Sequence, residues 1–248
     1  LSSMTRHELL IIMTVGMSTI AGSVMVVYTT MLFPIYGSGL IGHFLSASLI
    51  SVPAAIMYAN MMIPSNEKTD FPDEKSDDMY SSIMDAITQG TKNGLDIFLN
   101  VIAMLIVVMA LVFLVNSILG LLPNLNGNPI TLELMLGYLF APLAWFMGIP
   151  WNESIMAGQL LGVKTALNEF VAYLYLSDTE TYQLGDKSRM IMLYALCGFA
   201  NFSSVGILLS GLSAMVPERR ADLISVSGKA LWCALLASCL TGFIIGIL

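Results

Sequence analysis

Charged side chains are scarce in this sequence: 11% of its 248 residues are charged, whereas 56% are hydrophobic. An average soluble domain carries about 25% charged residues, so this composition predicts an integral membrane protein. Histidine and cysteine are also rare, with 2 and 3 residues. The 10 lysines and arginines are too few for a nucleic-acid-binding face, which excludes that class of partner.

Recognisable enzyme motifs are missing as well. The sequence has no HExxH, no nucleophile elbow and no P-loop, so it indicates no enzyme class. An intramembrane enzyme with Glu169 as acid or base is disfavoured, because no histidine or lysine lies near the candidate serine nucleophiles. The cysteines Cys197, Cys233 and Cys239 fall within apolar stretches, and their spacing fits neither a metal site nor a disulfide framework. We interpret them as small apolar residues.

Several apolar runs are long enough to cross a bilayer, which takes about 20 helical residues. The clearest are 97–115, interrupted by Asn100, and 229–248, whose one charge is its first residue. Further candidates are 9–33, 40–63 and 190–215. We therefore predict an all-α integral membrane protein with about five transmembrane helices.

Two remaining segments are apolar but do not read as simple crossings. Pro142 would kink a helix over 131–151, and the neighbouring tryptophans are typical of the membrane interface, so an interfacial helix is favoured there. Segment 152–176 has two apolar halves, each too short to span alone, separated by Asn168 and Glu169. This arrangement predicts a re-entrant helical hairpin.

The predicted organisation has six parts. They are two transmembrane helices over 1–63 with a break near 16–24, an acidic cytoplasmic linker and interfacial helix over 64–94, a transmembrane helix over 95–120, an interfacial helix over 131–151, a hairpin over 152–176, and a broken helix followed by a final transmembrane helix over 190–248.

Small polar residues interrupt two of the predicted spans at their middle. Both TVGMSTIAGSVMVV at 14–27 and ALCGFANFSSVGIL at 195–208 combine glycine with serine, threonine or asparagine. Burying an unpaired amide or hydroxyl costs roughly 1–3 kcal/mol, so each interruption needs a partner. Helix–helix packing through small residues is one explanation. The other is a pair of broken helices lining a transporter's binding site, where unwound backbone faces a cavity.

Glu169 bears on this choice. A carboxylate at the membrane midplane costs around 2.5–3.5 kcal/mol, so it must face a cavity, a partner or a substrate unless it lies among the headgroups. Together with Asn168, Asn201 and Ser204 it offers amides, a hydroxyl and one strong acceptor. That set suits a neutral, polyhydroxylated ligand.

Six stretches of the sequence resemble the concentrative nucleoside transporters, in the C-terminal portion of their bacterial members. They run in family order over nearly the whole chain. The stretches are MTRHELLIIMTVGMSTIAGSV (4–24), GHFLSASLISVPAAIMYANMMIP (42–64), LGYLFAPLAWFMGIPW (136–151), ALNEFVAY (166–173), ALCGFANFSSVGI (195–207) and GLSAMVPERRADL (211–223).

The resemblance implies an elevator-type secondary transporter that assembles as a homotrimer, with 1–63 in the moving transport domain and 95–120 in the scaffold. It implies that Glu169, Asn201 and Ser204 bind the ribose hydroxyls. Phe199 would then lie close to the ligand and Val24 beside the base. Thr19, through its hydroxyl, and Ile20, through its carbonyl, would form part of a sodium site.

The implied function is cation-coupled nucleoside uptake, by symport with Na⁺ or H⁺, across a bacterial inner membrane. No other cofactor is expected. The family's first hairpin would precede Leu1, so we expect this chain to be a C-terminal portion that does not transport alone. A membrane receptor or assembly subunit, with polar interruptions used for helix packing, is the alternative.

Overall fold

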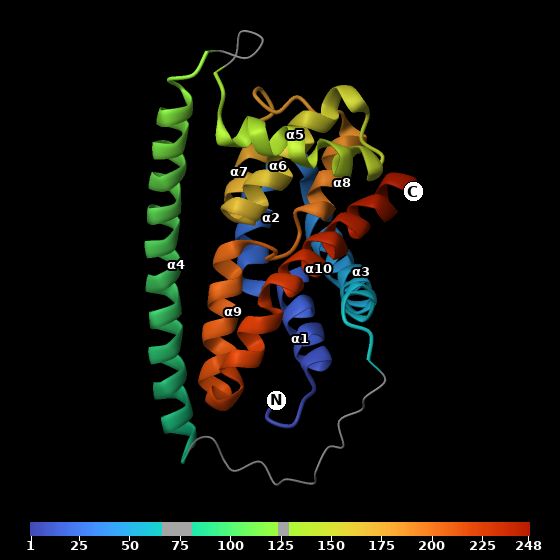
Figure 1. The fold of residues 1–248 in the computed structure, drawn as a ribbon. Helices are drawn as coiled ribbons and strands as arrows, with labels where there is room; N and C mark the ends of the chain where they lie inside the picture. Colours follow the sequence, from blue (N-terminus) through green and yellow to red (C-terminus); the bar gives the residue numbers. More distant parts are fainter. Residues whose placement is uncertain (66–80, 124–128) are drawn as a thin grey trace.

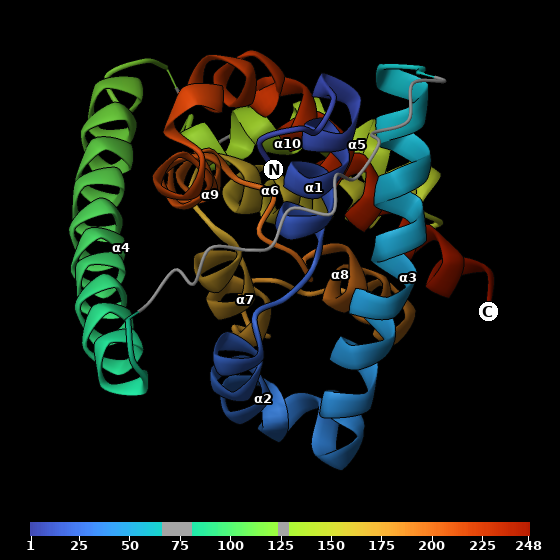
Figure 2. The same ribbon diagram turned by 90° about the horizontal axis from the view of Figure 1, so that it is seen from below.

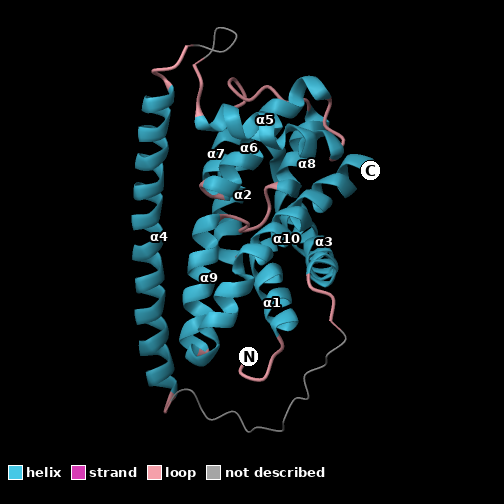
Figure 3. Ribbon diagram, in the orientation of Figure 1, coloured by secondary structure: helices cyan, strands magenta, loops and turns pink. Residues whose placement is uncertain are grey.

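The computed structural model describes residues 1–65, 81–123 and 129–248, and within these ranges it contains helices and loops but no strand (Figure 3). The all-α prediction is therefore confirmed for the described residues, while the acidic linker expected at 66–78 lies outside them. The α-helices are α1 (Arg6–Ser18), α2 (Gly22–Tyr36), α3 (Leu40–Met62), α4 (Ile83–Leu119), α5 (Leu132–Phe146), α6 (Trp151–Ala166), α7 (Glu169–Ser177), α8 (Asp186–Ala195), α9 (Phe202–Met215) and α10 (Arg220–Ile247).

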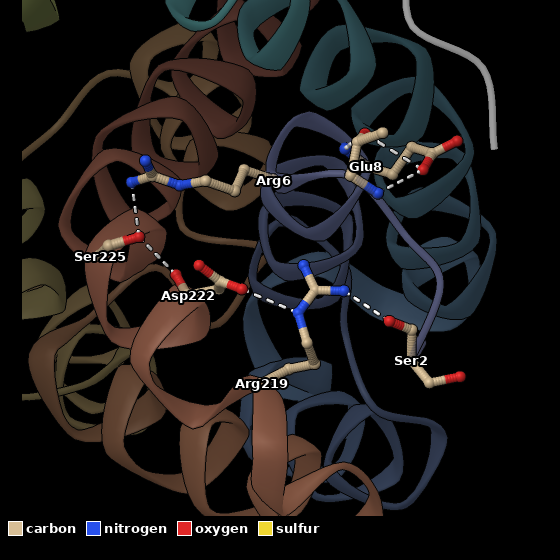
Figure 4. A network of polar contacts seen from close by, with 7 residues as sticks. Ser2, Arg6, Glu8, Arg219, Asp222 and Ser225 are labelled. Carbon is tan, nitrogen blue, oxygen red and sulfur yellow. Dashed lines mark hydrogen bonds and ion pairs between the residues drawn. The ribbon is translucent and has the colours of Figure 1, made fainter.

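Helix α1 starts at a capping box. Thr5 accepts a hydrogen bond from the Glu8 backbone N–H, and the Glu8 carboxylate accepts one from the Thr5 N–H at 2.8 Å. This satisfies donors that the first helical turn leaves without intrahelical partners. The start of α1 is also tied to the start of α10. Arg6 donates to Ser225 at 2.7 Å, and Arg219 pairs with Asp222 at 2.8 Å while donating to the Ser2 carbonyl (Figure 4).

Two non-helical breaks in the chain each separate a pair of consecutive helices, and the two breaks pack against each other. The first separates α1 from α2 at 19–21, and the second separates α8 from α9 at 196–201. Gly198 in the second break has a φ of +142°, and a Cβ built there would lie 2.6 Å from the Ser18 carbonyl oxygen at the end of α1. Glycine is therefore required both by the backbone conformation and by the approach of another backbone. In Figure 1 the connection from α8 to α9 runs through the middle of the molecule.

Helices α5 and α6 pack through glycines. The helix axis turns by 117° between them, at a connection where Gly148 has a φ of +95°. A Cβ on Gly158 would collide with the backbone of α5, and one on Gly162 would collide with Leu136. Pro142 lies inside α5 without ending it. Two segments with glycines four positions apart pack within the chain: GQLLG at 158–162 faces α5, and GFIIG at 242–246 faces α8 and the backbone of Met147.

Helix α4 corrects one predicted boundary. The sequence suggested an interfacial helix ending at 94 and a separate transmembrane helix from 95, whereas α4 is continuous over 37 residues from Ile83. Gly90 and Gly94 each cost only about 1 kcal/mol in a helix interior, and no proline lies between the two parts. Figures 1 and 2 show α4 standing beside the other helices along most of their length.

The end of α4 is hydrogen-bonded to the start of α5 through Asn116. Its amide donates to Glu133 at 2.9 Å, and its carbonyl accepts from the Leu132 N–H at 2.7 Å. Glu133 is thus bound at the start of α5 and partly buried, although the sequence alone gives no sign of this partner.

Two helical stretches of the described residues are long and apolar enough to cross a membrane, Arg6–Met62 and Pro217–Ile247. The bent pair α5–α6 is a third candidate if it forms one broken span.

Candidate functional site

Glu169 is held inside the protein by groups from two distant helices. It is the first residue of α7 and is 4% exposed. The Tyr28 hydroxyl of α2 donates to its Oε1 at 2.8 Å, and the Asn201 amide at the start of α9 donates to its Oε2 at 2.9 Å. The N-terminus of a helix carries a partial positive charge, which also favours the carboxylate. Glu169 is therefore surrounded by protein donors and is not an exposed helix end.

Asn168 and Asn201 start the helices that meet at this carboxylate. The Oδ1 of Asn168 accepts from the Val171 N–H at 3.0 Å, and the Oδ1 of Asn201 accepts from the Ser204 N–H at 2.7 Å. Asparagine is among the best N-cap residues, and replacing such a cap with alanine costs about 1 kcal/mol. The motifs NEF and NFSS thus define two helix starts. Asn201 does two things at once, since its oxygen caps α9 while its nitrogen binds Glu169.

The other predicted ligand-binding residues lie around these two helix starts. Ser204 is in the first turn of α9 and Phe199 in the break before it, while Val24 is in the first turn of α2. All three side chains are partly exposed. Aromatic rings pack around Tyr28, whose ring centroid lies 4.7 Å from that of Tyr173 and 6.2 Å from that of Phe170.

Thr19 and Ile20, the predicted sodium ligands, both lie in the break between α1 and α2. The Thr19 hydroxyl donates to the Val15 carbonyl at 3.1 Å, and Ser48 of α3 accepts from the Ile20 N–H at 3.3 Å. Among the described residues no cluster of His, Cys, Asp or Glu could hold a metal ion. A cation here would depend on hydroxyl and carbonyl oxygens, and unwound backbone carbonyls are the groups that bind coupling ions in broken helices.

Sequence reasoning missed two polar side chains that the structure places in this region. Tyr28 is fully buried, and a buried tyrosine hydroxyl normally has a hydrogen-bond partner, so a tyrosine within an apolar run was a usable signal. Lys164 is also fully buried and donates to Ala195 of α8 and Ser238 of α10. Its position in the apolar stretch QLLGVKTAL was the corresponding signal.

Curated relatives match nearly the whole of this chain. It is 39% identical over 252 residues to the uncharacterized transporter YutK of Bacillus subtilis, covering 99% of this chain and 60% of that protein. It is 34% identical to the nucleoside permease NupC of Helicobacter pylori, covering 100% of this chain and 59% of that protein. Human solute carrier family 28 member 3 is 36% identical, covering 98% of this chain and 37% of that protein. The chain thus spans about 60% of the length of its bacterial relatives.

Solved structures give the same result. The structure of CNTnw in an inward-facing substrate-bound state has 35% identity and a TM-score of 0.83, covering 99% of this chain and 58% of that chain. A CNTnw variant in an intermediate state has a TM-score of 0.85 at 34% identity, covering 100% of this chain and 60% of the other. Residues 43–246 match the family described as Na⁺ dependent nucleoside transporter C-terminus. The sequence resemblance is confirmed, and the chain belongs to the Na⁺-dependent nucleoside transporter family.

Proposed function

We propose that the complete protein carrying this chain takes up nucleosides across the bacterial cytoplasmic membrane, coupled to a cation. The observation that carries the proposal is the enclosed Glu169 carboxylate, bound by Tyr28 at 2.8 Å and by Asn201 at 2.9 Å where two half-helices begin. A buried ionisable group within an apolar helical protein is a functional-site signal. The names of the relatives supply the substrate class.

The ribose hydroxyls are bound by Glu169, Asn201 and Ser204 in this proposal. Each carboxylate oxygen of Glu169 has a second lone pair beyond the one used by Tyr28 or Asn201, so it can accept a further bond from a hydroxyl. Phe199 and Val24 supply apolar contacts beside the ligand. Asn168 contributes through its amide nitrogen, because its oxygen caps α7.

Na⁺ is the proposed coupling ion, with Thr19 and Ile20 as part of its site. The Thr19 hydroxyl and the Ile20 carbonyl would hold it, together with ligands from residues beyond this chain. When bound, the ion supplies positive charge next to the first break. By linkage, cation and nucleoside must raise each other's affinity by the same factor.

The transport step follows the family scheme of an elevator in a homotrimer. We assign α1–α3 and α6–α10 to the moving domain and α4 to the scaffold, and we propose about five crossings in all. Two observations support this division: α4 stands beside the remaining helices (Figure 2), and α1, α8 and α9 meet at the crossed breaks. Among the described residues we assign the re-entrant hairpin to α6–α7, and the rest of the site would come from preceding sequence.

Uptake of labelled uridine into vesicles containing the complete protein tests the proposal. We expect accumulation only when a cation gradient is imposed, and at least a 100-fold loss for Glu169→Gln. Glu180→Gln is the matched control, because Glu180 is an exposed carboxylate of the loop after α7. Binding without accumulation would instead support a receptor or assembly subunit, and full activity of Glu169→Gln would contradict the site.

A further inference from the structure

Two buried charges belong to the same hairpin. Of the Asp, Glu, Lys and Arg residues that the structure describes, only Lys164 and Glu169 are buried, at 0% and 4% exposure. Lys164 lies in the last turn of α6 and Glu169 begins α7, five positions later. No ion pair between described residues joins them, but their hydrogen bonds hold Lys164 at Ala195 and Glu169 at Asn201, the two ends of the second break. The hairpin thus brings one positive and one negative group into the interior together.

Lys164 binds the end of a half-helix. Its ammonium donates to the carbonyl of Ala195, the last residue of α8, at 2.8 Å and to the Ser238 hydroxyl of α10 at 2.7 Å. Ser238 in turn donates to the Leu235 carbonyl at 2.9 Å. The C-terminal end of a helix carries a partial negative charge and leaves carbonyls without intrahelical donors. A cation is well placed there, directly before the second break.

Glu169 lies among helix N-termini, whose partial positive charge favours an anion, whereas Lys164 lies at a helix C-terminus. It lies at the N-terminus of α7 and receives the amide of Asn201 at the N-terminus of α9. The second broken helix therefore has a cation at the carbonyl end of α8 and an anion at the amide end of α9. Burying an isolated charge is costly, and opposite charges in a low-dielectric interior offset that cost.

The first broken helix lacks such a pair. No lysine or arginine among the described residues is buried at the break between α1 and α2, where Thr19 and Ser48 supply the polar contacts. Under the proposed function, Na⁺ would supply the positive charge at this first break.

We propose that Lys164 is the permanent counter-cation of Glu169, a positioning residue that balances the carboxylate's charge through the hairpin and takes the place of an ion at the second break. This inference rests on the proposed function for the role of Glu169 and for the ion at the first break. The charge balance itself is measurable without any ligand.

A double-mutant cycle on the melting temperature of the complete, detergent-solubilised protein tests it. The variants are Lys164→Met, Glu169→Gln and the double substitution, with Lys187→Met as a control because Lys187 is an exposed lysine of α8. We expect Lys164→Met to lower the melting temperature and Glu169→Gln to restore at least half of that loss. Lys187→Met should have no effect, alone or with Glu169→Gln. Losses that simply add, or loss of folded protein in Lys164→Met that Glu169→Gln does not relieve, would overturn the proposal.

Lys164→Gln provides the second measurement, because an amide keeps hydrogen-bond donors but carries no charge. We expect its uridine Kd to be at least 10-fold weaker than that of the wild type at equal Na⁺. A wild-type Kd would show that the hydrogen bonds suffice and that the charge is dispensable. If the wild type itself binds no uridine, the proposed function fails, while the melting-temperature cycle still decides the charge pairing.

Discussion

At the break between α1 and α2, neutral groups hold the backbone: Thr19 donates to Val15, and Ser48 accepts from the Ile20 N–H. At the break between α8 and α9, charged groups act instead, with Lys164 on the Ala195 carbonyl and Glu169 on the Asn201 amide. Both breaks expose the same kinds of backbone group. The difference teaches that the second break has a lysine of the protein bound to its carbonyl end, whereas at the first break the described polar contacts are neutral.

The largest expected effect comes from filling the point where the two breaks cross. Gly198→Ala places a methyl against the Ser18 carbonyl and forces alanine to a φ of +142°, a conformation that costs of order 1–3 kcal/mol before the clash is counted. We expect little folded protein, measured by size-exclusion yield and thermal unfolding. Gly206→Ala is the control, since a Cβ there meets nothing within 4 Å. Normal folding of Gly198→Ala would mean that the breaks do not pack as described.

The next largest effect distinguishes helix capping from ligand binding at the starts of α7 and α9. Asn168→Ala and Asn201→Ala each remove one N-cap, so both should lose about 1 kcal/mol of unfolding free energy. Only Asn201→Ala also removes a donor to Glu169, and hydrogen bonds to charged groups contribute about 1.5–3 kcal/mol. We expect uridine affinity to fall about 100-fold for Asn201→Ala and less than about 10-fold for Asn168→Ala, by calorimetry. Equal losses would remove the special role of Asn201.

The smallest effect concerns the first break. Ser48→Ala removes the acceptor of the Ile20 N–H, a long bond of 3.3 Å whose net contribution is about 0.5–1.5 kcal/mol. The Na⁺ concentration for half-maximal uridine binding should rise by about 2–10-fold, because the backbone near the proposed ion site is held less firmly. Ser46→Ala on the same helix is the control, and its Na⁺ dependence should not change. An unchanged Na⁺ dependence in Ser48→Ala would argue that Ile20 takes no part in ion binding.

Local features of the fold could be predicted from the sequence. The capping box at Thr5 and Glu8, the interruptions near Gly16–Gly22 and Gly198–Ser204, and the helix start at Asn168 all depend on residues within a few positions of one another. The candidate site could be predicted in part for the same reason, since Glu169 and Asn201 each stand at a helix start with a recognisable pattern, while its role in ligand binding stays a prediction.

Contacts between distant positions could not be predicted in this way. Tyr28 reaches Glu169 across 141 positions, and Lys164 reaches Ser238 across 74. Nothing in the sequence near Lys164 indicates which carbonyl it binds, because that depends on how α8 and α10 pack against α6. The continuity of α4 was missed for a different reason: a change from polar to apolar residues along one helix resembles a boundary between two.

The glycine contacts of α5, α6 and α10 have a consequence for how such a molecule can move. Where the main chain of one helix lies directly on that of another, as Gly246 does on Met147, there are no rotamers to exchange. That block therefore has little freedom to repack, and we expect it to behave as one rigid unit.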